Sequence, residues 1–128
     1  MALAGSDNES VYLLFPNDLD PGNKIEAGKR LQLPRPNWRL KAGGPAGTDS
    51  LLVVVSDAPR DTSKLGTSRA GPFMLSLNDA QGRAQLGALL TTSQAGGSKQ
   101  CSSATARRNA ALCSDAFGAV LTSVEEIP

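Results

Sequence analysis

The sequence contains no histidine among its 128 residues. Histidine is the commonest general base, the commonest metal ligand and the side chain that titrates closest to physiological pH. Its absence excludes Ser-His-Asp and Cys-His catalysis and every zinc site that uses an imidazole. The Ser, Lys and carboxylate side chains show no spacing that supports a Ser-Lys or dicarboxylate enzyme. We therefore expect a protein that is not an enzyme and has no cofactor or metal.

Concentrated charge and long apolar runs are also lacking. The 13 basic and 12 acidic side chains give a net charge of +1, whereas nucleic-acid binding needs a clustered basic face. No apolar run reaches the roughly 18 residues that span a membrane. The first ten residues lack the basic and apolar regions of a signal peptide. We expect neither nucleic-acid binding nor direct membrane insertion by this chain, and its small-molecule or protein partner stays open.

Aromatic residues are scarce, with three Phe, one Tyr and one Trp, whereas 13 Gly and 8 Pro predict many turns and short elements. The length suits one domain. The small, polar residues 1–9 are expected to be a disordered leader or an artificial start. Residues 10–128 are expected to form a single domain, which we interpret as a fragment of a larger protein.

Short β-strands are predicted along most of the chain. Five consecutive aliphatic residues at Leu51–Val55 indicate a central strand that is covered on both faces. Val11–Phe15 forms a hydrophobic strand that ends at Pro16 and a turn. Weaker patterns of apolar and polar residues predict further strands at 24–27, 30–33, 38–42 and 116–124. Residues 73–77 are either a strand or the entry segment of the helix that follows.

One helix is predicted over residues 79–91, with Asn78 or Asp79 as its N-cap. Gly82 and Gly87 would each weaken this helix by up to about 1 kcal/mol. Together these elements predict a mainly β fold, a β-sandwich of about seven short strands with one packed helix. An α+β arrangement is the alternative.

The two cysteines, Cys101 and Cys113, admit several interpretations. A zinc site would need two further ligands that the sequence does not offer, and a redox pair needs closer spacing. Two buried free thiols would suit a cytosolic protein. We favour a disulfide, because closing this polar, Ala/Ser-rich segment would stabilise the fold by about 3 kcal/mol. A disulfide would place the domain in an oxidising compartment, periplasmic or extracellular.

Two groups of side chains are candidates for partner binding. One is the only tryptophan with its two flanking cations, although a lone Trp on an alternating strand is more often a core residue. The other is a mixed-charge cluster beyond the strand at 51–55, which is more often a turn with local ion pairs. The candidates are Arg35, Trp38, Arg39, Asp57, Arg60 and Asp61.

The spacing of Asp18 and Asp20 is that of the first two ligands of an EF-hand calcium loop. The pattern then fails, because Gly22 stands at the fifth position and Lys29 where a bidentate Glu is required. A solvated β-turn is therefore favoured over a calcium site.

The order of several turn and core motifs resembles the family of domains of unknown function called DUF4384. The matching motifs are Phe15-Pro16-Asn17, Ala27-Gly28, Leu33-Pro34 and Pro45–Asp49 leading into the strand at 51–55. The resemblance covers about residues 10–66 and includes no catalytic residues. The segment after Cys113 is similar to the end of versions attached to bacterial serine/threonine kinases.

This resemblance implies an accessory domain, a C-terminal appendage of bacterial Ser/Thr kinases, caspase-like peptidases or envelope proteins. We expect a non-catalytic binding or sensory domain, the extracytoplasmic part of a larger protein such as a transmembrane kinase. Its loops at one end, for example Arg35–Arg39 and Asp57–Lys64, would recognise the ligand. The alternative is a structural or assembly module of a secretion or surface machine, which would bind a protein by strand addition at an open sheet edge.

Overall fold

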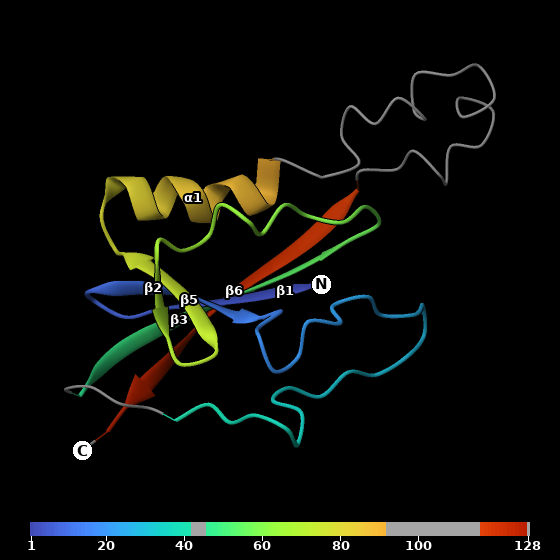
Figure 1. The fold of residues 1–128 in the computed structure, drawn as a ribbon, viewed down its shortest axis with the longest axis horizontal. Coiled ribbons are helices and arrows are strands. Elements are labelled where there is room, and N and C mark those ends of the chain that lie inside the picture. Colours follow the sequence, from blue (N-terminus) through green and yellow to red (C-terminus); the bar gives the residue numbers. More distant parts are fainter. Residues whose placement is uncertain (42–45, 92–115, 128) are drawn as a thin grey trace.

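A computed structural model describes residues 1–41, 46–91 and 116–127 of the chain. These residues form one sheet and one helix (Figure 1). In chain order the elements are β1 (Ala2–Ser6), β2 (Ser10–Phe15), β3 (Gly47–Ser56), β4 (Ser68–Ala70), β5 (Phe73–Leu77), α1 (Ala80–Thr91) and β6 (Phe117–Glu126).

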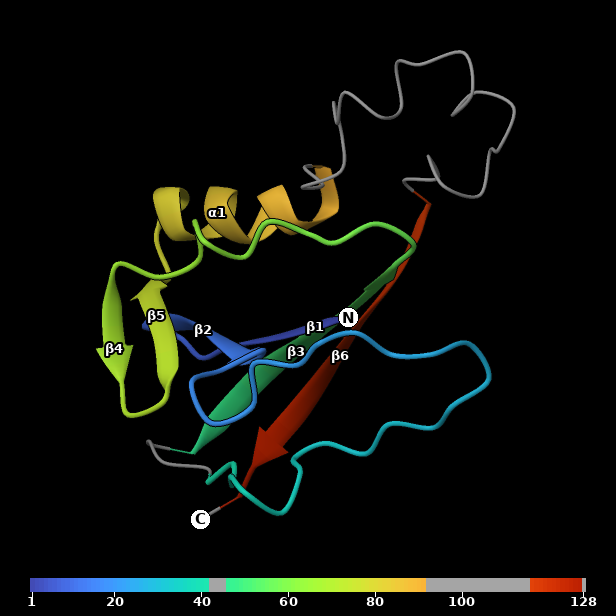
Figure 2. The same cartoon turned by 45° about the vertical axis from the view of Figure 1, so that its right-hand side comes forward.

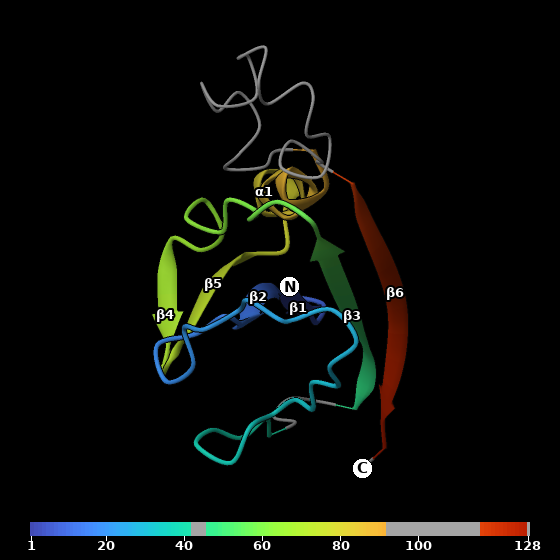
Figure 3. The ribbon, with the colours of Figure 1, turned by 90° about the vertical axis from the view of Figure 1, so that its right-hand side faces the viewer.

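The sheet has six strands in the order β4-β5-β2-β1-β3-β6, and every neighbouring pair is antiparallel. It is strongly curved, with β4 on one side and β6 on the other (Figure 3). The prediction of a mainly β fold with one helix is confirmed. The predicted sandwich of about seven strands is corrected, because the described residues form one open sheet.

Residues 16–41 explain this difference. The predicted strands at 24–27, 30–33 and 38–41 are absent, and this part of the chain runs irregularly across one face of the sheet (Figure 2). Pro34 and Pro36 have no N–H for a strand ladder, and Asn17 and Asp20 pair only with each other in an isolated bridge. The segment therefore covers the sheet without forming a second one. The Phe15–Pro16 and Leu33–Pro34 peptide bonds are cis.

Strand β1 lies in the middle of the sheet, between β2 and β3. The prediction that residues 1–9 are a disordered leader is therefore wrong for Ala2–Ser6. The small side chains of this strand hide its alternation in the sequence, yet they allow close packing. A Cβ on Gly5 would lie 2.9 Å from the Leu14 Cδ1 atom, so this position suits a glycine.

Several other predictions are confirmed. Val11–Phe15 and 73–77 lie in β2 and β5, the closing strand is β6, and the helix begins after Asp79, whose Oδ1 accepts from the N–H of Gly82 at 2.8 Å. β3 is an interior strand, but it is not covered on both faces. Val54 is 1% exposed whereas Val55 is 43% exposed.

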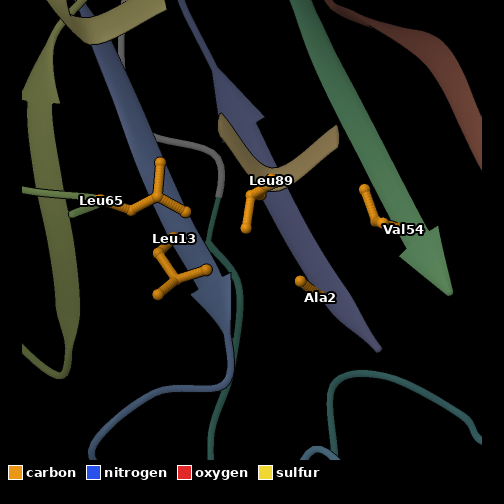
Figure 4. Packing of buried hydrophobic residues seen from close by; sticks show 5 residues of the cluster. All are labelled: Ala2, Leu13, Val54, Leu65 and Leu89. Atoms are coloured by element: carbon orange, nitrogen blue, oxygen red, sulfur yellow. The ribbon is translucent and has the colours of Figure 1, made fainter. Parts of the chain in front are cut away.

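Each face of the sheet carries its own core. The face under α1, which we call the helix face, holds a cluster that includes Leu89 of the helix (Figure 4). The opposite face, which we call the loop face, lies against residues 16–41 (Figure 3). The buried residues are Ala2, Leu13, Val54, Leu65 and Leu89 on the helix face, and Leu3, Leu14, Phe15 and Trp38 on the loop face.

A bulge in β2 supplies part of the loop-face core. Leu3 pairs with Phe15 whereas the next residue, Ala4, pairs with Leu13, so Leu14 is an extra residue in β2. Such a bulge shifts the alternation of the strand by one position. Leu14 and Phe15 consequently pack in the same cluster although they are neighbours in sequence.

Candidate functional site

The most distinctive surface of the described chain is the outer edge of β6. This strand is 10 residues long and pairs with β3 without a break in register, from Gly47 opposite Glu126 to Ser56 opposite Phe117. Its other side has no neighbouring strand among the described residues (Figure 2). A free edge presents a row of backbone N–H and C=O groups to which another strand can pair.

The side chains of β6 are apolar and exposed. Val120 is 63% exposed and Leu121, which points to the opposite face, is 70% exposed. Phe117, Val124 and the adjoining Ile127 are exposed as well. The helix makes its main contacts with β2 and β5, so it covers the sheet away from β6. An added strand could therefore bury apolar area on both faces of the sheet.

The backbone of β6 has a defined orientation. The N–H of Asp57 donates to the carbonyl oxygen of Ala116 at 3.0 Å, which makes these two residues a hydrogen-bonded pair at the start of the ladder. Hydrogen-bonded and non-hydrogen-bonded pairs alternate along an antiparallel ladder. The even-numbered residues of β6 therefore bond to β3. The odd-numbered residues of β6 point their backbone N–H and C=O groups away from β3, toward the free edge. They are Phe117, Ala119, Leu121, Ser123 and Glu125.

The β6 edge also lacks the usual features that prevent edge pairing. Proteins protect free edges with prolines, lysines, bulges or very short strands. β6 contains no Pro or Lys, and its only charges are Glu125 and Glu126 at one end. The opposite edge, β4, is three residues long, and its Arg69 forms an ion pair with Asp18. The two edges of the sheet thus differ sharply in their capacity to accept a strand.

The first group of predicted partner-binding residues lies at the loop face. Trp38 is 4% exposed, its Nε1 donates to Asp20 Oδ2 at 3.0 Å, and its ring meets Phe73 edge-on at 5.8 Å between centroids. Arg35 donates to Asp20 Oδ1 at 2.9 Å, whereas Arg39 is exposed. Trp38 is thus a core residue. The two aspartates of the calcium-loop pattern form ion pairs instead, Asp20 with Arg35 and Asp18 with Arg69.

The second group lies on the other side of the sheet, near α1. Arg60 is 6% exposed, and its guanidinium carbon lies 4.6 Å from the centroid of the Phe117 ring in β6. Hydrogen bonds from the side chain and backbone of Ser63 lower the pKa of Asp61 below its ordinary value. Asp57 is exposed. The structure therefore does not bring the two predicted groups together on one surface (Figure 3).

A hollow of about 290 Å³ on the loop face is a second candidate. Its polar lining includes Asp7, Tyr12, Lys41 and Asp49, and the Tyr12 hydroxyl donates to Asp7 Oδ2 at 3.3 Å. This volume is at the lower limit of typical ligand pockets, about 300–1,000 Å³. The hollow could hold only a small ligand, so the β6 edge is the stronger candidate.

Two further findings limit the chemistry of the described residues. No group of three or more acidic or cysteine side chains lies close enough to hold a metal ion within residues 1–41, 46–91 and 116–127. No helix in the same ranges is long and apolar enough to cross a membrane. Cys101 and Cys113 lie outside the described residues, and their disulfide stays a prediction.

Comparison with known proteins gives one match. Residues 3–59 match the model of a family described as "Domain of unknown function (DUF4384)". No curated protein and no solved structure matches the chain. The matched range includes β1, β2, residues 16–41 and β3, and β6 lies outside it. The family's part of the chain thus forms the interior of the sheet on which the exposed edge is built.

Proposed function

Residues 3–59 belong to the DUF4384 family, and on this premise we propose that the chain is a non-catalytic accessory domain that binds protein through the outer edge of β6. The partner would supply an extended segment that adds a strand to the sheet. Main-chain hydrogen bonds would give affinity, and contacts with alternate side chains would give specificity.

The observation that supports this proposal is the 10-residue strand at the end of the sheet, with apolar side chains exposed on both faces. Among the two functions that the sequence suggested, strand addition agrees better with the structure than recognition by loops. The loop residues that were candidates include Trp38 and Arg60, which are 4% and 6% exposed. Such residues stabilise the domain and offer little area to a partner.

The cellular setting of the domain is part of the same proposal. A disulfide between Cys101 and Cys113 would suit a periplasmic or extracellular location. The resemblance to domains attached to bacterial kinases favours an extracytoplasmic sensory role in a larger envelope protein such as a transmembrane Ser/Thr kinase. An assembly module of a secretion or surface machine is the alternative, and both roles would use the β6 edge in the same way.

A library of displayed peptides tests the binding mode. Peptides selected on the intact chain are expected to bind in an extended form and to shift the amide resonances of β6 and β3. A Leu121→Lys variant should bind them at least about fivefold more weakly, because a lysine on an edge strand opposes pairing.

Leu77→Lys is the matched control. Leu77 in β5 is 65% exposed and Leu121 is 70% exposed. However, β5 lies between β4 and β2, and only its last two residues extend beyond the pairing with β4. Leu77→Lys should leave peptide affinity unchanged. The proposal fails if no peptide is recovered, or if the selected peptides shift resonances around the loop-face hollow and bind both variants equally.

A further inference from the structure

We propose that the strand which pairs with β6 is β6 of a second copy of this chain. This inference rests on the proposed function, because it names the partner of the same edge. Two copies would meet about a two-fold axis, and their sheets would join into one continuous antiparallel sheet. In such an interface the same surface patch is used on both subunits.

The backbone orientation of β6 restricts the register of this pairing. In an antiparallel ladder, opposite residues either both point their N–H and C=O groups at the partner or both point them away. Outward-pointing residues in β6 are odd-numbered, so odd residues must face odd ones and even residues must face even ones. The two-fold axis must therefore pass through a residue position, and the positions nearest the middle of β6 are Leu121 and Thr122.

The side chains favour the register centred on Thr122. It places Val120 opposite Val124, and it places Phe117 opposite the adjoining Ile127. Thr122 faces its own copy in a non-hydrogen-bonded pair, where side chains approach most closely, and Thr–Thr and β-branched pairs stabilise such positions.

The register centred on Leu121 is less favourable. It would place Phe117 opposite Glu125, and Gly118 opposite Val124. An apolar ring would then face a carboxylate, and a valine would face a position with no side chain. Among the described residues, this register would leave Ile127 without a residue opposite it, so one fewer outward-pointing residue of each copy would be paired.

Charge is compatible with the Thr122 register. Glu125 lies opposite Ala119 and Glu126 lies opposite Gly118, so no two acidic residues face each other. The partner's Glu125 would project to the helix face. On that face the Arg60 guanidinium stacks on Phe117. Phe117 lies two residues from Ala119 and is therefore the diagonal neighbour of the partner's Glu125. Attraction between these opposite charges would favour the assembly.

The proposed pairing also stops at two copies. Each β6 edge is occupied by the other, and the edges that remain in the described part of the sheet are the three-residue β4 strands. Very short edge strands do not support further pairing. The geometry thus gives a closed dimer in place of an open-ended fibre.

Sedimentation velocity of the intact chain over a range of concentrations tests the inference. We expect a monomer–dimer equilibrium for the wild type. Thr122→Lys would place two lysines directly opposite each other at the axis and should weaken the dimer at least about fivefold. Ala119→Lys would place each lysine opposite the partner's Glu125 and should leave the dimer intact or tighten it.

A second measurement uses only the wild-type chain, so its result does not depend on whether a variant folds. In a mixture of isotope-labelled and unlabelled wild-type chains, a strong intermolecular Hα–Hα contact is expected for Thr122 with its own copy, and another between Val120 and Val124. A wild-type chain that stays monomeric at all concentrations overturns the inference, as does a dimer that lacks these contacts or tolerates Thr122→Lys. Selected peptides that still bind β6 would in that case leave the proposed function standing, with a different protein as the partner.

Discussion

An Asp20→Ala variant is expected to have a free energy of unfolding about 3 kcal/mol below that of the wild type. The Asp20 carboxylate is buried at the loop face, where it accepts from Trp38 Nε1 at 3.0 Å and from Arg35 at 2.9 Å. Its removal would leave the indole N–H without an acceptor and the guanidinium without its counter-charge. The expected loss is at the low end for a buried ion pair because the Arg35 side chain is 35% exposed.

Chemical denaturation of the two variants Asp20→Ala and Asp18→Ala measures this effect. Asp18 forms an ion pair with Arg69, but both of these side chains are more than half exposed. Pairs of this kind contribute at most about 1 kcal/mol, so Asp18→Ala should change stability little. Equal losses for the two variants would show that the bonds from Asp20 to Trp38 and Arg35 do not stabilise the fold as proposed.

Two glycines in α1 are expected to respond to alanine in opposite directions. A Cβ on Gly82 would lie 1.9 Å from the backbone oxygen of Leu77, so the start of the helix would have to move away from the end of β5. Overpacking of this kind costs about 2 kcal/mol or more. A Cβ on Gly87 would meet nothing within 4 Å, and Gly87→Ala should stabilise the helix by about 1 kcal/mol.

Thermal and chemical unfolding of Gly82→Ala and Gly87→Ala compare the two sites directly. The sequence predicts the same small penalty for both glycines, whereas the structure separates them by the approach of one to a backbone carbonyl. If Gly82→Ala is as stable as Gly87→Ala, the helix does not meet β5 as closely as this geometry requires.

Long or strongly patterned elements could be predicted from the sequence. β2, β3 and α1 each combine an apolar run or a helical period with a clear end signal, such as Pro16 after Phe15 or Asp79 before α1. Residues 24–33 show how alternation can mislead. Leu31 and Leu33 do pack on the loop-face core, but from an irregular segment whose prolines prevent a ladder.

The turn after β2 has a structural explanation that its sequence only partly indicates. The Asn17 side chain donates to the Leu14 carbonyl at 2.8 Å and accepts from the backbone N–H groups of Leu19 and Asp20, each at 2.9 Å. A single buried amide thus fixes the turn. Asn and Asp are typical of turns for this reason, but the sequence cannot show that Asp20 then bonds to Trp38, 18 positions further along the chain.

The candidate site was the least predictable part. The sequence predicts the closing strand at 116–124 but not its exposure, and β6 is exposed on both faces. Whether the last strand of a sheet is covered depends on where the helix lies, and α1 packs mainly on β2 and β5. That placement results from long-range packing, for which a single sequence carries no local signal.

Residue-resolved amide hydrogen exchange on β6 tests the central claim that its outer edge is free for strand addition. In dilute solution, the amides of Ala119, Leu121 and Ser123 should exchange much faster than those of Val120 and Thr122, which bond to β3. These outward amides should become protected when the concentration is raised or a selected peptide is added. Slow exchange at all of them in the dilute chain, or no change when a partner binds, would contradict the account.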